Sequence, residues 1–201
     1  MQRALWWFEV TGEAVVLGST QPDTVVDRGR AEAAGVEVAR RRSGGGAVWL
    51  APGEVTWVDV LVPAGDRVWD DDVVAAASWL GEAWAAALGS LGVTGCEVHR
   101  GGLVRSTWSD AVCFAGLGPG EVTVGGRKVV GISQRRTRAG ARFQCAALHR
   151  WVPGPLVELL DLGPGATDAL GRSAVGIDEL TGTRTTSVAV VEALGEVLPP
   201  T

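Results

Sequence analysis

The sequence predicts an α+β protein, a single domain over residues 1–201 with a mixed, mostly antiparallel sheet flanked by helices. Short apolar runs separated by glycine and proline turns dominate the middle of the chain, which is the pattern of strands. Segments with helical periodicity are interspersed among them. The 201 residues and the hydrophobic content of 46% suit one well-filled core.

The first third of the chain is expected to hold four strands and one helix. Asp23 or Thr24 can cap that helix, which should run to about Ala34 and end at Gly35, because glycine tolerates the left-handed conformation at a helix C-terminus. Around it, apolar runs are bounded by turn residues. The strands expected here cover residues 14–18, 36–39, 47–50 and 55–62.

The longest helix is expected next. Asp70, Asp71 and Asp72 open it, since acidic side chains complement the positive end of the helix dipole. Apolar residues then recur every three or four positions to about Leu91, which gives one apolar stripe. Trp84 lies in that stripe, and we expect it to pack in the core.

The second half of the chain returns to strands and ends in helices. Gly125-Gly126 is a two-residue hairpin signal between two strands. The last segment is amphipathic, as expected of a terminal helix. The expected strands cover 96–100, 111–114, 121–124, 127–134 and 143–151, with a weaker one near Val104, and the expected helices cover 153–160, 166–170 and 187–198.

Charge and cysteine content exclude several classes of protein. The net charge of −5 gives no support to general nucleic-acid binding, but the basic residues are clustered, which indicates a specific anionic ligand or an acidic partner. Three cysteines without a CxxC pair predict neither a disulfide framework nor a metal site. No apolar run is long enough for a signal peptide or a membrane span, so we expect a cytoplasmic protein.

A glycine loop follows three arginines at residues 40–48, Arg-Arg-Arg-Ser-Gly-Gly-Gly-Ala-Val. It is neither a P-loop, because no Gly-Lys-Ser/Thr follows, nor a dinucleotide fingerprint, because the segment after it looks extended. Glycines expose backbone N–H groups, and arginines supply bidentate donors to phosphate or carboxylate. An anion-binding loop and a tight turn with surface arginines both fit, and we favour the ligand loop.

Lys128 stands on a predicted strand whose even-numbered residues share one face. It would project alongside Val130 and Ile132, which should face the core. A lysine on an apolar face either snorkels at a strand end or takes part in chemistry. Gly131, on the opposite face, predicts the close approach of another group.

Cys113 is a second candidate for chemistry. Free cysteines are most often buried, small apolar residues, whereas a catalytic thiolate needs a basic group nearby, and the sequence places none beside it. Cys145 has the same structural interpretation and no supporting motif. His99 and His149 are isolated histidines, for which structural roles are favoured.

Together the two motifs resemble the superfamily of lipoate–protein ligases, octanoyltransferases and biotin–protein ligases. Residues 40–48 are similar to the lipoate ligase signature, and Val124–Arg136 is similar to the family's Lys-x-x-Gly strand. The resemblance covers roughly residues 10–150. It implies the catalytic-domain fold of these enzymes, without the ligases' accessory C-terminal domain.

The resemblance implies acyl transfer to the lysine of lipoyl domains of 2-oxoacid dehydrogenases or of the glycine cleavage H protein. In the ligases, ATP and Mg²⁺ activate lipoate or octanoate as an adenylate, the Arg-Gly loop wraps the acyl-adenylate, and the matching lysine, here Lys128, is catalytic. The implied substrate-binding residues are Arg41, Arg42, Ser43, Gly44, Gly45, Gly46, Ala47, Gly131 and Ser133.

Two alternatives remain open. In the octanoyltransferase branch, which uses no cofactor, a cysteine takes the acyl group from acyl carrier protein, and Cys113-Phe114 resembles that position. The other alternative is a diverged protein that only binds acyl chains or lipoyl domains, because Leu50-Ala51 and Gln144-Cys145-Ala146 stand where the family often has histidines. A separate accessory protein is a further expected partner of a ligase this short.

Overall fold

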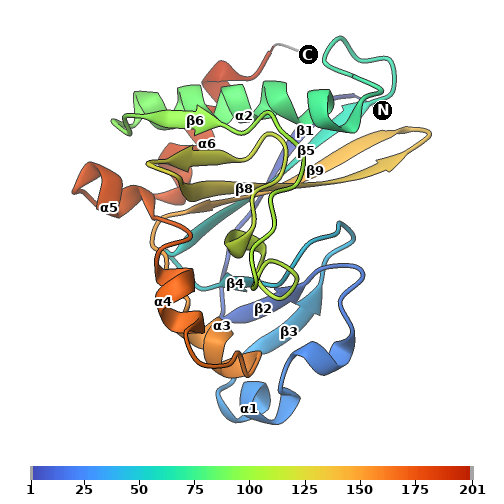
Figure 1. Ribbon diagram of the computed structural model, residues 1–201. Coiled ribbons are helices and arrows are strands. Elements are labelled where there is room, and N and C mark those ends of the chain that lie inside the picture. Colours follow the sequence, from blue (N-terminus) through green and yellow to red (C-terminus); the bar gives the residue numbers. More distant parts are fainter. Residues whose placement is uncertain (1, 200–201) are drawn as a thin grey trace.

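Two sheets organise the computed structural model, which describes residues 2–199 (Figure 1). Six strands form a sheet in the order β1-β5-β9-β8-β7-β6, and every neighbouring pair in it is antiparallel. Three strands form a smaller sheet in the order β3-β2-β4, in which β2 pairs parallel with β3 and antiparallel with β4. The predicted α+β class with a mixed, mostly antiparallel arrangement is confirmed.

The bounds of the elements are as follows. The strands are β1 (Ala4–Phe8), β2 (Ala14–Leu17), β3 (Glu37–Arg40), β4 (Val48–Leu50), β5 (Val55–Pro63), β6 (Cys96–Val98), β7 (Val122–Val124), β8 (Arg127–Thr137) and β9 (Gly140–Leu148). The α-helices are α1 (Arg28–Ala33), α2 (Val73–Ser90), α3 (Gly154–Leu159), α4 (Ala166–Gly171), α5 (Ile177–Thr181) and α6 (Ser187–Val197), and two 3-10 helices cover Asp23–Val25 and Cys113–Ala115.

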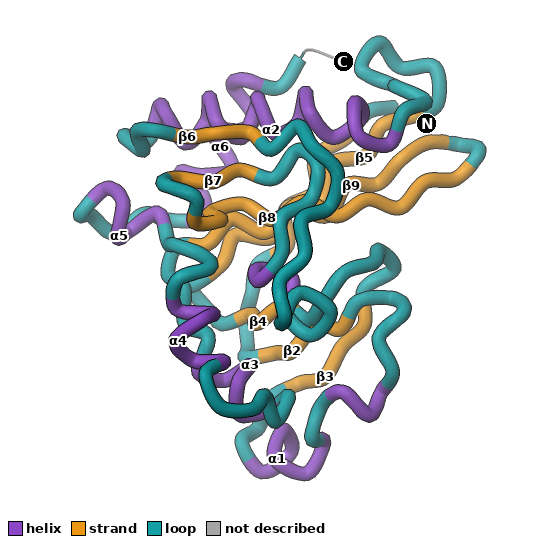
Figure 2. The backbone as a smooth tube through the Cα atoms, viewed as in Figure 1, coloured by secondary structure: helices purple, strands orange, loops and turns teal. Residues whose placement is uncertain are grey.

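The layers follow from which strand faces are apolar. Helices α2 and α6 cover one face of the six-stranded sheet (Figures 1 and 2). The other face packs toward the small sheet, whose central strand β2 is buried on both sides: Val16 points to the large sheet, whereas Val15 and Leu17 pack with α1, α3 and α4. The space between the two sheets is where the glycine loop meets β8.

Helix α2 forms where the sequence predicts it. The carboxylate of Asp72 accepts hydrogen bonds from the N–H groups of Val74 and Ala75, so Asp72 is the N-cap. Trp84 is fully buried, as expected. A Cβ atom added to Gly81 would lie 2.2 Å from Gly120 O, so glycine at this position lets the loop before β7 approach the helix.

Two predictions about elements were wrong, and two elements were missed. The first α-helix is capped by Asp27 and not by Asp23 or Thr24: the chain forms a separate 3-10 helix at Asp23–Val25, where the Asp23 carboxylate pairs with Arg40. The segment 111–114 is not a strand, because its hydrogen bonds are turn-like and its only ladder contact is a bridge between Ala47 and Val112. Edge strand β1 and helix α5 were not predicted.

A bulge in β8 overturns the predicted orientation of Lys128. Val122 pairs with Val130, but Thr123 pairs with Lys128, so the register shifts by one residue between them. A one-residue shift reverses the face on which the following side chains lie. Val130 and Ile132 pack in the core with α2, whereas Lys128 turns toward Phe114, on the face of Gly131.

Candidate active site

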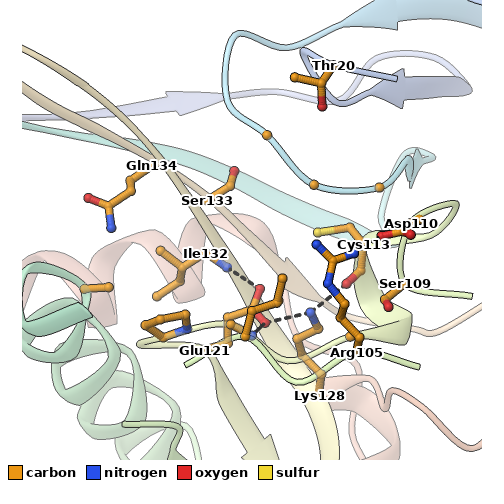
Figure 3. A pocket seen from close by; sticks show the side chains of 18 of the residues that line it. Thr20, Arg105, Ser109, Asp110, Cys113, Glu121, Lys128, Ile132, Ser133 and Gln134 are labelled. Atoms are coloured by element: carbon orange, nitrogen blue, oxygen red, sulfur yellow. Dashed lines mark hydrogen bonds and ion pairs between the residues drawn. The ribbon is translucent and has the colours of Figure 1, made fainter. Parts of the chain in front are cut away.

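A cleft of about 590 Å³ opens between the glycine loop, strand β8 and the N-terminal end of α2 (Figure 3). Gly44, Gly45 and Gly46 line one wall, and Lys128 and Cys113 lie deeper. Much of its remaining lining is apolar: Val73 and Ala77 of α2, Ile132 of β8, and Leu103, Gly116, Gly118 and Pro119 of the segment before β7. Arg105, Asp110 and Glu121 are charged residues in the lining, and Arg105 pairs with Asp110. The cleft suits an apolar chain ending in a polar, reactive group.

The buried side chain of Arg41 holds the backbone of the glycine loop through hydrogen bonds. Its guanidinium donates hydrogen bonds to Val16 O at 3.1 Å and to Gly44 O and Gly46 O, both at 2.8 Å. The residue is 5% exposed, and burial lowers the pKa of its guanidinium. The guanidinium therefore holds the shape of the loop.

The two neighbouring arginines differ from each other. Arg40 donates to Gly18 O and Gln21 O and pairs with Asp23, so it also serves the loop structure. Arg42 is exposed and forms no hydrogen bond or ion pair with any residue in the range 2–199; it does not line the cleft. The cluster that suggested an anion site is thus divided between structural and surface roles.

The glycines leave the loop no space for side chains at two points. A Cβ atom at Gly18 would lie 1.8 Å from Gly45 O, and one at Gly46 would lie 2.6 Å from the Val112 backbone; Gly45 itself has φ 97°. Within the described residues, the N–H groups of Gly44 and Gly45 donate no hydrogen bond. Both residues line the cleft, so these N–H groups are candidate donors to an anionic or carbonyl oxygen.

A polar network fixes the loop to the large sheet. The Ser43 hydroxyl lies 2.8 Å from the Ser133 hydroxyl and donates to Gln144 Oε1 at 2.8 Å. Behind it, the buried Asp59 carboxylate accepts hydrogen bonds from Trp57 and Arg142. Gln144 stands at one of the positions where the family often has a histidine, and here it anchors Ser43.

Lys128 lies at the floor of the cleft and is 2% exposed. Its ammonium donates to the Glu121 carboxylate at 2.8 Å and to Cys113 O at 2.7 Å, and it lies 5.1 Å from the centre of the Phe114 ring. An ammonium has three N–H donors, so one remains for a substrate oxygen. Figure 3 shows this group beside Glu121.

Glu121 is the residue that the sequence interpretation missed. It is 3% exposed, and its carboxylate also accepts from Gly118 N at 2.6 Å and Ile132 N at 3.1 Å. The hairpin at Gly125-Gly126 could have revealed it, because Thr123 pairs with Lys128 and residues two apart on a strand share a face. That register places Glu121 diagonally across from Lys128.

Other predicted residues shape the site from behind. Ala47 is fully buried; its carbonyl accepts from Cys113 N, so it positions the cysteine. A Cβ atom on Gly131 would lie 3.2 Å from Phe114, which is the close approach that the glycine predicted. His149 is buried away from the cleft beside Thr56, and burial lowers its pKa. Residues 2–199 contain no cluster of metal-ligand side chains.

The three cysteines are free and occupy different environments. Cys113 lines the cleft and is partly exposed. Cys145 is completely buried in the core under α2, and burial raises the pKa of its thiol to about 12. Burial also raises the pKa of Cys96.

This difference predicts selective labelling. At pH 8 iodoacetamide is expected to modify Cys113 first and to leave Cys145 unmodified in the folded protein. The reagent reacts with the thiolate form of cysteine, and the buried Cys145 thiol keeps its proton. Peptide mass spectrometry reads out each site, and labelling in urea provides the control in which all three react. Equal labelling of Cys145 and Cys113 in the native protein would contradict this assignment.

The arrangement of the two sheets around the cleft matches solved lipoate protein ligases. Lipoate-protein ligase A bound with ATP gives a TM-score of 0.77 at 18% identity, over 98% of this chain and 71% of that chain. A bi-partite lipoate protein ligase from Thermoplasma acidophilum, studied with its E2 lipoyl domain, gives 0.74 at 18% identity, over 98% and 70%. P. falciparum LipL1 in complex with lipoate gives 0.66 at 14% identity, over 98% and 46%. The protein therefore has the fold of a lipoate ligase catalytic domain.

The family follows from the sequence comparison. The family model of the lipoyl protein ligase A/B catalytic domain matches residues 2–195. The chain belongs to this family, which confirms the resemblance drawn from the glycine loop and the Lys128 strand. No match to a curated protein was found. In the described residues no helix has the length and apolar character to cross a membrane.

Proposed function

We propose that this protein is an enzyme that transfers a lipoyl or octanoyl group to the lysine of a lipoyl domain. The observation that carries the proposal is the Lys128 ammonium, buried in a largely apolar cleft that the glycine loop also lines. When an amine attacks an acyl carbon, negative charge develops on the carbonyl oxygen. A fixed cation in a water-poor site stabilises that charge.

The leading route is that of a ligase, with ATP and Mg²⁺ as co-substrates. The N–H groups of Gly44 and Gly45 and the remaining donor of Lys128 fit phosphate and carbonyl oxygens. Arg105 also lines the cleft and would add a further cation for a phosphate, although in this structure its guanidinium pairs with the Asp110 carboxylate. ATP would activate the acyl carboxylate as a mixed anhydride with AMP, with pyrophosphate leaving as the bond between the α- and β-phosphates breaks. The chain's own residues orient the acyl carbonyl, and the acceptor amine forms the amide bond as that anhydride bond breaks.

The position of Cys113 favours a second route. Its thiol lines the cleft, and its carbonyl oxygen accepts from Lys128. A thiolate here can attack a thioester of acyl carrier protein, releasing the carrier thiol, and then pass the acyl group to the acceptor lysine while the C–S bond breaks. This octanoyltransferase route requires neither ATP nor a metal.

Partners and location complete the proposal. The acceptors are lipoyl domains of 2-oxoacid dehydrogenases or the glycine cleavage H protein, and acyl carrier protein is the donor on the second route. An accessory protein is a further partner, which fits the description of the Thermoplasma ligase as bi-partite. The free thiols suit the reducing cytoplasm.

Intact mass of a lipoyl domain tests the proposal. One reaction contains ATP, Mg²⁺ and lipoate or octanoate, and the other contains octanoyl-acyl carrier protein without ATP; both are repeated with a candidate accessory protein. Mass gain only with ATP supports the ligase. Gain only from the carrier protein, with a hydroxylamine-labile adduct that Cys113→Ser abolishes, supports the thioester route. No gain in any reaction contradicts acyl transfer and favours a binding protein.

A further inference from the structure

Three arginines of the glycine loop and the β8–β9 hairpin have side chains without a partner. Arg42, Arg135 and Arg138, named here the rim arginines, are exposed, and their guanidinium groups form no ion pair or hydrogen bond with the residues that the structure describes. None of them lines the cleft. From residue 129 to residue 157 the chain contains no aspartate or glutamate at all. The β8–β9 hairpin and the segment after it therefore supply no carboxylate that could neutralise Arg135 and Arg138.

The topology brings Arg42 and Arg135 near residues that line the cleft, and Arg138 lies farther along the same hairpin. Arg135 pairs with Arg142 across β8 and β9, and Ser133 pairs with Gln144, so Arg135 lies on the sheet face of Ser133. Ser133 contacts Ser43, ninety residues away in sequence, and Arg42 immediately precedes Ser43. Arg138 lies in the turn of the β8–β9 hairpin, which projects at the right of Figure 1.

The fold offers no reason to keep these charges. Like charges directly opposite each other on neighbouring strands are destabilising, and Arg135 faces Arg142. Arg142 is neutralised by the buried Asp59, but Arg135 has no such carboxylate. Arginine presents a planar set of donors that matches carboxylates, so an unpaired group of arginines fits an acidic protein surface.

We propose that the rim arginines form the docking surface for the acidic face of the domain that presents the acceptor lysine. This rests on the proposed function, since a protein-borne lysine must enter at the cleft mouth. The rim arginines stand outside the cleft, where a partner that covers the mouth touches them and an acyl chain inside does not. The net charge of −5 disfavours nucleic acid as the occupant.

Binding of a recombinant lipoyl domain, measured by calorimetry at 20 mM and 300 mM salt, tests the surface. The double variant Arg135→Glu/Arg138→Glu is expected to raise the Kd at least ~10-fold at low salt, and its salt dependence should be weaker than that of the wild type. Arg172→Glu, at the end of α4, is the matched control, because Arg172 is equally exposed. It should bind as the wild type does.

Turnover separates docking from chemistry. The double variant should raise KM for the lipoyl domain and leave kcat, and the rate with a small amine acceptor such as hydroxylamine, unchanged. In the lipoyl domain, replacing the carboxylate residues around the acceptor lysine with lysine should restore its affinity for the double variant. Binding without any acyl transfer would refute the proposed function and leave the docking surface standing.

Three outcomes overturn the docking proposal. The first is a wild-type protein that does not bind the lipoyl domain. The second is a double variant that binds it as tightly as the wild type, or a loss that Arg172→Glu reproduces. The third is lost affinity only for octanoyl-acyl carrier protein or for a 20-nucleotide DNA duplex, which would assign the surface to the donor or to nucleic acid.

Discussion

Replacing Lys128 with Ala is expected to lower acyl transfer at least ~10²-fold, whichever route supplies the acyl group. Both routes pass through attack on an acyl carbonyl, and the Lys128 ammonium is the fixed cation at the floor of the cleft. Two of its N–H groups donate hydrogen bonds to Cys113 O and to the Glu121 carboxylate, and these bonds fix the direction of the third N–H group. Because the group is preorganised, its loss should lower kcat more than it changes KM for the acyl donor.

The control for this variant lies next to it. Arg127→Ala removes a surface ion pair with Glu179, and the Arg127 side chain does not line the cleft, so the change should cost at most about 1 kcal/mol of stability and leave kcat unchanged. Lys128→Met keeps most of the side-chain volume and should be as inactive as Lys128→Ala. Wild-type turnover in either folded Lys128 variant would remove this residue from the mechanism.

The sequence located the site better than it assigned the roles within it. The resemblance implied that the glycine loop binds substrate and that Lys128 is catalytic, and in the structure both line one cleft. Arg41, however, was predicted to bind substrate, and its guanidinium serves three backbone carbonyls. Sequence cannot distinguish these roles, because an arginine beside a glycine loop offers the same donors to a ligand and to the loop itself.

Strand alternation failed where the backbone departs from a regular ladder. The two-residue alternation of a regular strand predicted that Lys128 and Val130 share a face. The bulge adds one residue between them, so Lys128 lies on the opposite face. The sequence Lys128-Val129-Val130 does not indicate the bulge. Val129 and Val130 are adjacent valines and both are buried, so the pattern does not show which of them is the extra residue. The role of Glu121 could not be predicted from composition, but the hairpin register, which pairs Thr123 with Lys128, would have placed Glu121 near Lys128.

Removing Glu121 is the second change with a large expected effect, and it acts on stability. Glu121→Leu should destabilise the protein by about 3–5 kcal/mol, because it leaves the Lys128 ammonium buried without its counter-charge. The N–H groups of Gly118 and Ile132 lose their acceptor as well. Urea unfolding followed by tryptophan fluorescence measures the loss. A change below about 1 kcal/mol would mean that the ammonium finds water or another partner in the folded state.

The double variant Glu121→Gln/Lys128→Met separates stability from function. It removes both charges, and the glutamine oxygen still accepts one backbone hydrogen bond, so it should be more stable than Glu121→Leu. It should nevertheless be as inactive as Lys128→Ala. A buried ion pair contributes little net stability compared with a neutral, well-packed replacement, so stability alone does not explain why this cleft contains one. If the double variant proves both stable and active, the pair is a structural feature and the cation that acts on the acyl group lies elsewhere.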